Sequence, residues 1–227
     1  MSSYGQFCSV ARALEAVGGR WTLLIVRELL CGSRRFNDIR RGIPRISRTM
    51  LSERLQELIQ LGAIMRIEGK NGPEYELTEA GRELMSLISA LGTWGQRWLP
   101  RRTESEDLDL EPLLVDMQRR VRHELVPKEP LVLRFEIEGY RQPHFMLLKG
   151  AETSLCTYNP GFPEPVCVRA RLSSLAAWLA AWWRGDVTFN GAQRMGLKVQ
   201  GPKELVRAFP SWFERYLFAP VAPAAAD

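Results

Sequence analysis

Arginine is the residue type whose concentration points to chemistry in this chain. Seven arginines lie between positions 34 and 54, with only two acids, Asp38 and Glu53, among them. The planar guanidinium carries a fork of donors that matches phosphate oxygens and the acceptor pair on a guanine edge. The stretch could therefore bind a nucleic acid, although a solvated amphipathic helix with a basic face would have a similar composition.

The residues around these arginines predict two short helices joined by a tight turn at Gly42-Ile43-Pro44. Ser47 can cap the first turn of the second helix, and Gly62 is a residue type that ends helices. An apolar stripe with the spacing of a buried helical face is formed by Leu51, Leu55, Leu58 and Ile59. The pattern is that of a helix-turn-helix whose outward face carries donors.

A change to a strand-like pattern follows Gly62. Residues 64–68 and 73–77 read as two strands, joined by a turn at 69–72 that contains Lys70 and Asn71. A hairpin directly behind a recognition helix is the wing of a winged helix, and a basic tip can reach the sugar-phosphate backbone. The candidate DNA contacts are Arg34, Arg35, Ser47, Arg48, Thr49, Ser52, Arg54, Lys70 and Asn71.

Charge is unevenly distributed along the 227 residues. The net charge is +5, but residues 1–102 hold 16 Lys or Arg against 10 Asp or Glu, and residues 103–227 hold 15 against 16. The excess in the first part suggests a polyanionic partner, although solubility alone would also explain it.

Several classes of protein are disfavoured by what the sequence lacks. There is no signal-peptide pattern and no apolar run long enough to span a membrane, so we expect a cytoplasmic protein. Four scattered cysteines without a CxxC pair and only two histidines give no metal site and no disulfide framework. No dinucleotide, nucleophile-elbow or phosphate-loop motif is present, so neither an enzyme nor a cofactor is expected.

The first hundred residues resemble the HxlR-type winged-helix transcriptional regulators, relatives of the MarR group. The motifs that carry the resemblance are Cys8, residues 18–22 (GGRWT), 32–36 (GSRRF), 46–55 (ISRTMLSERL), 75–81 (YELTEAG) and 94–95 (WG). The resemblance implies homodimers that bind inverted repeats in DNA, usually as repressors and sometimes as activators. It also implies a sensor of oxidants or electrophiles at Cys8, although a small buried cysteine is an equally good interpretation. The wing departs from the family pattern, because Pro73 stands where a proline pair is frequent.

A second signal for dimerisation lies in the helix expected from Thr78 and Glu79 onward. One broad apolar side is formed by Leu84, Leu87, Ile88, Leu91, Trp94 and Trp98. A small winged helix does not need that much apolar surface, so we expect it to be buried against a second copy. The alternative is that it packs on the C-terminal half of the same chain.

The second half predicts a separate domain. Residues 101–126 read as a charged linker with a helix from Pro112 to Leu125, and residues 131–137, 144–148 and 153–158 as antiparallel strands. A tryptophan-rich helix over 173–184, a short strand at 197–199 and a terminal helix over 203–218 complete the pattern. Residues 127–219 resemble the sterol carrier protein type 2 fold through 158–161 (YNPG), 183–187 (WRGDV) and 196–201 (GLKVQG), and 220–227 form a flexible tail.

That resemblance implies an apolar ligand cavity in the second domain. The side chains expected to line it are Leu133, Phe135, Phe145, Leu147, Leu175, Trp178, Leu179 and Trp182. A filled hydrophobic core is the competing interpretation, because large aromatic side chains usually dominate packing.

The sequence therefore predicts an α+β protein, with a winged helix-turn-helix domain over 1–100 and a sterol-carrier-like domain over 127–219. Its expected function is that of a homodimeric repressor that binds double-stranded DNA and senses an apolar small molecule. The alternative is a protein-interaction or lipid-carrier module whose winged helix serves protein contacts. Salt distinguishes them, because DNA binding through several arginines weakens steeply with added salt.

Overall fold

The computed structural model describes residues 3–70, 72–100, 109–140, 142–171 and 181–224. The chain divides into two compact units, one before and one after the boundary between Gly95 and Gln96.

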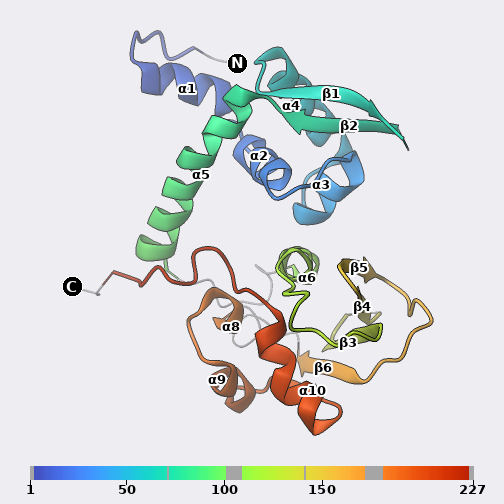
Figure 1. Cartoon of the computed structure of the whole chain (residues 1–227). Coiled ribbons are helices and arrows are strands. Elements are labelled where there is room, and N and C mark those ends of the chain that lie inside the picture. The colour runs from blue at the N-terminus through green and yellow to red at the C-terminus, as the bar shows by residue number, and fades with distance from the viewer. Residues whose placement is uncertain (1–2, 71, 101–108, 141, 172–180, 225–227) are drawn as a thin grey trace. The chain divides into compact units, whose positions relative to one another are not determined.

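The first unit contains four helices, a hairpin and most of a long helix, α5, whose last three residues lie past the boundary (Figure 1). The elements are α1 Ser9–Val17, α2 Thr22–Leu30, α3 Phe36–Gly42, α4 Arg48–Gln60, β1 Ile64–Gly69, β2 Gly72–Leu77 and α5 Glu79–Trp98. The order is that of a winged helix-turn-helix, as the sequence predicts.

Local sequence signals set the ends of α4. The Ser47 hydroxyl accepts a hydrogen bond from the Met50 amide at 3.1 Å, so it satisfies one of the helix's unpaired N–H groups. Gly62 has φ 75°, a left-handed conformation that glycine adopts without strain and that reverses the chain after the helix. The predicted limits of this helix are confirmed.

The core of the first unit forms where the apolar stripe of α4 meets α2 and the start of the wing. The side chains of this core include Ile25, Val26, Leu51, Leu55, Leu58 and Ile64, each no more than 2% exposed. The predicted stripe is confirmed, and it fixes which side of α4 faces water.

The second unit contains a five-stranded sheet with helices packed on it (Figure 1). The elements are α6 Leu110–Arg119, β3 Leu131–Glu138, β4 His144–Lys149, β5 Glu152–Cys156, β6 Val166–Arg171, α8 Ala181–Arg184, α9 Phe189–Arg194, β7 Lys198–Gln200, α10 Lys203–Ala208 and the 3-10 helix η3 Phe209–Trp212. The strand order is β5-β4-β3-β6-β7.

The expectation of an antiparallel sheet is wrong at its centre. Strands β3 and β6 pair in parallel, with Leu133 opposite Val166, while the other three pairings are antiparallel. The chain leaves β5 at one edge and crosses to the far side of β3, where β6 runs in the same direction as β3. Strand β6 was not expected from the sequence, although Val166 and Val168 alternate there with Cys167 and Arg169.

Two expected helices differ from those observed. The helix expected over 112–125 is α6, which begins at Leu110 and ends at Arg119, and its Leu110, Leu114 and Met117 are fully buried in the second core. The terminal helix expected over 203–218 stops as an α-helix at Ala208, because Pro210 cannot donate a helical hydrogen bond. The connecting segment thus contributes a helix to the core, while residues 101–108 lie outside the described ranges.

Across the ranges that the structure describes, none of the helices has the length and apolarity that a membrane crossing requires.

Candidate nucleic-acid interface

The outward face of α4 carries the main candidate contacts. Arg48, Thr49 and Ser52 are all exposed, because the leucine stripe takes the opposite side of the helix into the core. Gln56 is exposed one turn beyond Ser52 and two turns beyond Thr49, so it shares their face. Its amide can read an adenine edge, and its spacing from Ser52 is the signal that would have placed it among the candidates.

Arg48 and Arg54 differ in their surroundings. Arg48 makes no ion pair within the described part of the chain. Arg54 pairs with Glu57, and its side chain is only 19% exposed. Its guanidinium lies by Gly19, where an added β-carbon would stand 3.3 Å from Cζ. Arg54 therefore points to the connection between α1 and α2, away from the face that carries Arg48.

Arg34 and Arg35 are tied to the wing. Arg34 pairs with Glu76, and Nε of Arg35 lies 3.1 Å from Oε1 of Glu74. The backbone amide of Tyr75 also donates to the Arg34 carbonyl oxygen at 2.8 Å. These contacts hold strand β2 against the turn before α3, so both arginines position the wing.

The tip of the wing presents one described cation. Lys70 is exposed at the end of β1, where Gly69 pairs with Gly72 across the turn. Asn71, the other expected tip contact, lies outside the described residues.

The predicted dimerisation stripe on α5 separates into two parts. Leu84 and Ile88 pack on the core of the first unit. Leu87, Leu91, Trp94 and Trp98 are between 39% and 60% exposed. The helix therefore uses two of the six residues for its own unit and leaves four large apolar side chains uncovered.

Cys8 stands immediately before α1. Hydrogen bonds from the backbone amides of Ala11 and Val10 lower the pKa of its thiol, because these donors stabilise the thiolate. The thiolate is the form of a cysteine side chain that reacts with electrophiles.

The residues expected to line one apolar cavity do not share a side of the sheet. Leu133 and Phe135 lie in the core, whereas Phe145 and Leu147 pair with Arg134 and Val132 and so face the other side. Adjacent residues of a strand point to opposite faces, and the register of β3 with β4 decides which residues meet. The single-sided lining expected from the sequence is wrong for this reason.

The tryptophan-rich segment is described only from residue 181. Trp182 is 3% exposed and packs against Phe189, Phe209 and Phe213, with ring centroids 5.4 to 6.5 Å apart. Its side chain fills the core. The other expected lining residues, Leu175, Trp178 and Leu179, lie outside the described ranges.

Known proteins resemble the first part of the chain. Residues 16–103 match the model of the HxlR-like helix-turn-helix family. An HTH-type transcriptional regulator of Mycobacterium tuberculosis is 50% identical over 96 residues, which are 41% of this chain and 60% of the relative. The regulator YdeP of Bacillus subtilis is 37% identical over 41% of this chain and 76% of its own length. The reduced form of the transcriptional regulator YodB from B. subtilis is 34% identical, with a TM-score of 0.36, over 40% of this chain and 93% of that one.

The match thus spans about three fifths of the mycobacterial relative and three quarters of YdeP. The motifs at 18–22, 46–55 and 75–81 all lie within the matched residues, and they form the connection from α1 to α2, most of α4, and the end of β2 with the start of α5. The chain belongs to the HxlR-like helix-turn-helix family.

Proposed function

We propose that this chain is a homodimeric repressor that binds an inverted repeat in double-stranded DNA. The observation that carries the proposal is the outward face of α4, where Arg48, Thr49, Ser52 and Gln56 stand exposed beside a wing with a basic tip. An α-helix fits the major groove, and these side-chain types pair with base edges or phosphates there.

Each element of the interface has a distinct role in this arrangement. Arg48 donates to a guanine edge or a phosphate from the first turn of α4, and Gln56 reads a base farther along the groove. Lys70 reaches the sugar-phosphate backbone from the wing, whose direction is set by Arg34 and Arg35. Phosphate contacts fix the register of the domain on the duplex, and the residues of α4 supply the sequence preference.

Two copies of the domain are needed to read two half-sites. The exposed apolar residues of α5, Leu87, Leu91 and Trp94, would be covered in a symmetric dimer, and a two-fold axis matches an inverted repeat. Such a dimer spaces its recognition helices by about one turn of DNA. Occupation of the operator then blocks transcription in the cytoplasm, and the second unit tunes affinity by binding a small-molecule effector.

Selection of bound fragments from a pool of random duplex DNA tests the proposal directly. We expect enrichment of an inverted repeat, and an affinity for it that falls steeply as salt rises, because several phosphate contacts release counterions. Arg215, an exposed arginine of the second unit, gives the matched control: Arg215→Ala should bind like the wild type. Enrichment of no sequence, or an affinity that is insensitive to salt, would instead favour a module for protein contacts.

A further inference from the structure

The second unit has a pocket beside β7, the strand at one edge of its sheet. It lies between α9, β7 and α10 and has a volume of about 710 Å³, within the roughly 300 to 1,000 Å³ that small-molecule sites occupy. Its lining consists of Thr188, Phe189, Asn190, Gln193, Val199, Gln200, Gly201, Lys203, Val206, Arg207 and Pro210.

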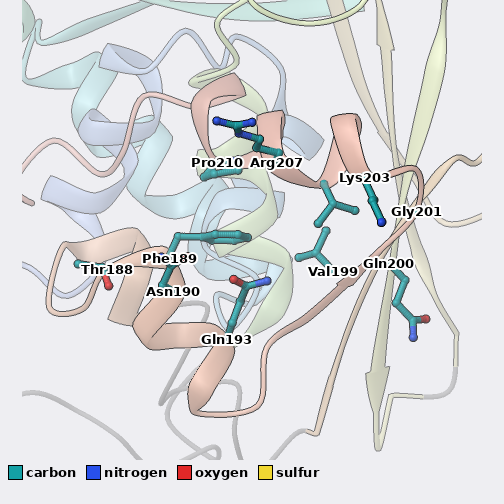
Figure 2. A pocket seen from close by; sticks show the side chains of 11 residues that line it. Thr188, Phe189, Asn190, Gln193, Val199, Gln200, Gly201, Lys203, Arg207 and Pro210 are labelled. Atoms are coloured by element: carbon teal, nitrogen blue, oxygen red, sulfur yellow. The ribbon is translucent and has the colours of Figure 1, made fainter.

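One part of this pocket is apolar and held in place by the core. The Phe189 ring packs on Trp182 at 5.4 Å and on Phe209 at 5.9 Å between ring centroids. Val199 pairs with Val168 of the neighbouring strand β6. In Figure 2, Phe189 and Gln193 extend from α9 toward the space that Val199 borders. The ring is therefore a fixed platform on which a flat ligand can stack.

The opposite wall is positively charged. Lys203, Val206 and Arg207 have the spacing of one side of α10, and they line the pocket together with Pro210 of η3. Among the described residues that line it there is no Asp or Glu, and neither Lys203 nor Arg207 makes an ion pair within the described chain. Both cations are therefore available to bind a negatively charged group.

Amides complete the lining. Asn190, Gln193 and Gln200 offer both donors and acceptors, while the Thr188 hydroxyl already accepts a hydrogen bond from the Gly191 amide. A lining with so many polar groups suits a long hydrocarbon chain poorly. It suits a ring that carries hydrogen-bonding substituents and a negative charge.

We propose that this pocket binds a flat aromatic molecule with an anionic group, with the ring on Phe189 and the anion between Lys203 and Arg207. The proposal deepens the effector role given to the second unit and rests on it for any effect on DNA. Its test measures binding without DNA, so failure here and failure of the proposed repressor are separate results.

Calorimetric titration of the full chain with 4-hydroxybenzoate is the first experiment, with the neutral 4-hydroxybenzamide as its matched ligand. We expect the acid to bind at least tenfold more tightly than the amide. The double variant Lys203→Ala with Arg207→Ala should bind the acid roughly tenfold more weakly, because it loses two partly exposed ion pairs with the ligand's carboxylate. Phenyl phosphate should compete with the acid, because the pocket recognises the ring and the charge together.

The control variant, Arg194→Ala with Arg215→Ala, removes the same two charges from exposed positions outside the lining and should bind the acid like wild type. If the acid and the amide bind equally well, or if the two double variants lose the same affinity for the acid, the proposal that Lys203 and Arg207 bind the anion is wrong. Tighter binding of decanoate than of 4-hydroxybenzoate would overturn the aromatic site in favour of an acyl chain. Competition by inorganic phosphate as strong as by phenyl phosphate would reduce it to a simple anion site.

Discussion

The carboxylate of Glu28 lies directly against the α-carbon of Gly42, so that this side chain of α2 packs on the backbone of α3. Glu28 is 1% exposed and pairs with Arg27 at 2.6 Å, and Arg27 also donates to the Gly42 carbonyl oxygen at 3.4 Å. A β-carbon at position 42 would overlap the Glu28 carboxylate. The contact sets how closely α3 approaches α2. Because α4 follows α3 after a short turn, the contact also affects the position of α4.

Gly42→Ala should lower the free energy of unfolding by about 1 to 3 kcal/mol, because the added methyl forces a buried, paired carboxylate to move. Urea denaturation followed by circular dichroism measures the change. Glu28→Ala in the same chain removes the obstructing group, so the double variant should lose less stability than the two single losses added together. Strict additivity would show that the overlap is relieved elsewhere.

Arg48→Ala should weaken binding to the selected duplex by about 1 to 3 kcal/mol, the size of one good base or phosphate contact. Arg54→Ala is the comparison on the same helix, because Arg54 points toward Gly19 and Glu57, and it should affect stability more than DNA affinity. Fluorescence anisotropy at two salt concentrations measures the DNA affinity of both variants, and urea denaturation measures their stability. If removing Arg48, Ser52 and Lys70 together leaves affinity unchanged in a folded protein, α4 is not the recognition helix.

Arg34→Ala should weaken DNA binding only while Glu76 is present. The arginine acts by holding β2, so once Glu76→Ala has broken the pair, its loss should have little further effect. The pair is largely exposed, so unfolding should change by less than about 1 kcal/mol. A double-mutant cycle in DNA affinity gives the coupling, and an equal loss from Arg34→Ala in both backgrounds would mean that Arg34 touches DNA directly.

Short-range signals account for what the sequence predicts well. The Ser47 cap, the leucine spacing and the glycines around the wing act within one element or one turn, and each is visible in a few neighbouring residues. The wing pairing follows, because the two strands are adjacent in the chain.

Contacts between distant residues account for what the sequence misses. The residues near Arg34 in the sequence do not predict its ion pair with Glu76. The parallel pairing of β3 with β6 depends on a crossover past two other strands. The prediction of a single-sided cavity lining is wrong for a related reason. The apolar residues of a strand can be identified from the sequence, but the side of the sheet that they face depends on the register with the neighbouring strand.

Cys8 should be alkylated at lower pH than Cys167. Backbone donors lower the pKa of Cys8, whereas burial raises that of Cys167, and the thiolate is the species that reacts. As pH rises, the thiolate of Cys8 therefore forms first. Mass spectrometry of peptides after brief iodoacetamide treatment across a pH series measures the order.

The sensor hypothesis predicts that the response of DNA binding to an oxidant depends on Cys8. If its oxidation controls DNA binding, Cys8→Ser should keep operator affinity after diamide treatment that changes the affinity of wild type. Cys31→Ser, at another surface cysteine, is the control and should respond like wild type. A Cys8→Ser protein that still responds to diamide would end the sensor hypothesis.

Leu91→Asp should dissociate the dimer and with it the high-affinity complex on the inverted repeat. Leu91 is 49% exposed in the single chain and lies on one side of α5 with Leu87 and Trp94, so a carboxylate there would be buried without a partner in the proposed interface. Met85 is 50% exposed on a different side of the same helix, which makes Met85→Asp the matched control.

Sedimentation velocity should show a monomer for Leu91→Asp and a dimer for Met85→Asp, while circular dichroism shows both folded. Binding to an isolated half-site should survive in both variants, because the α4 face of each copy is unchanged. If Leu91→Asp stays a dimer and binds the full repeat like wild type, the two copies meet through another surface.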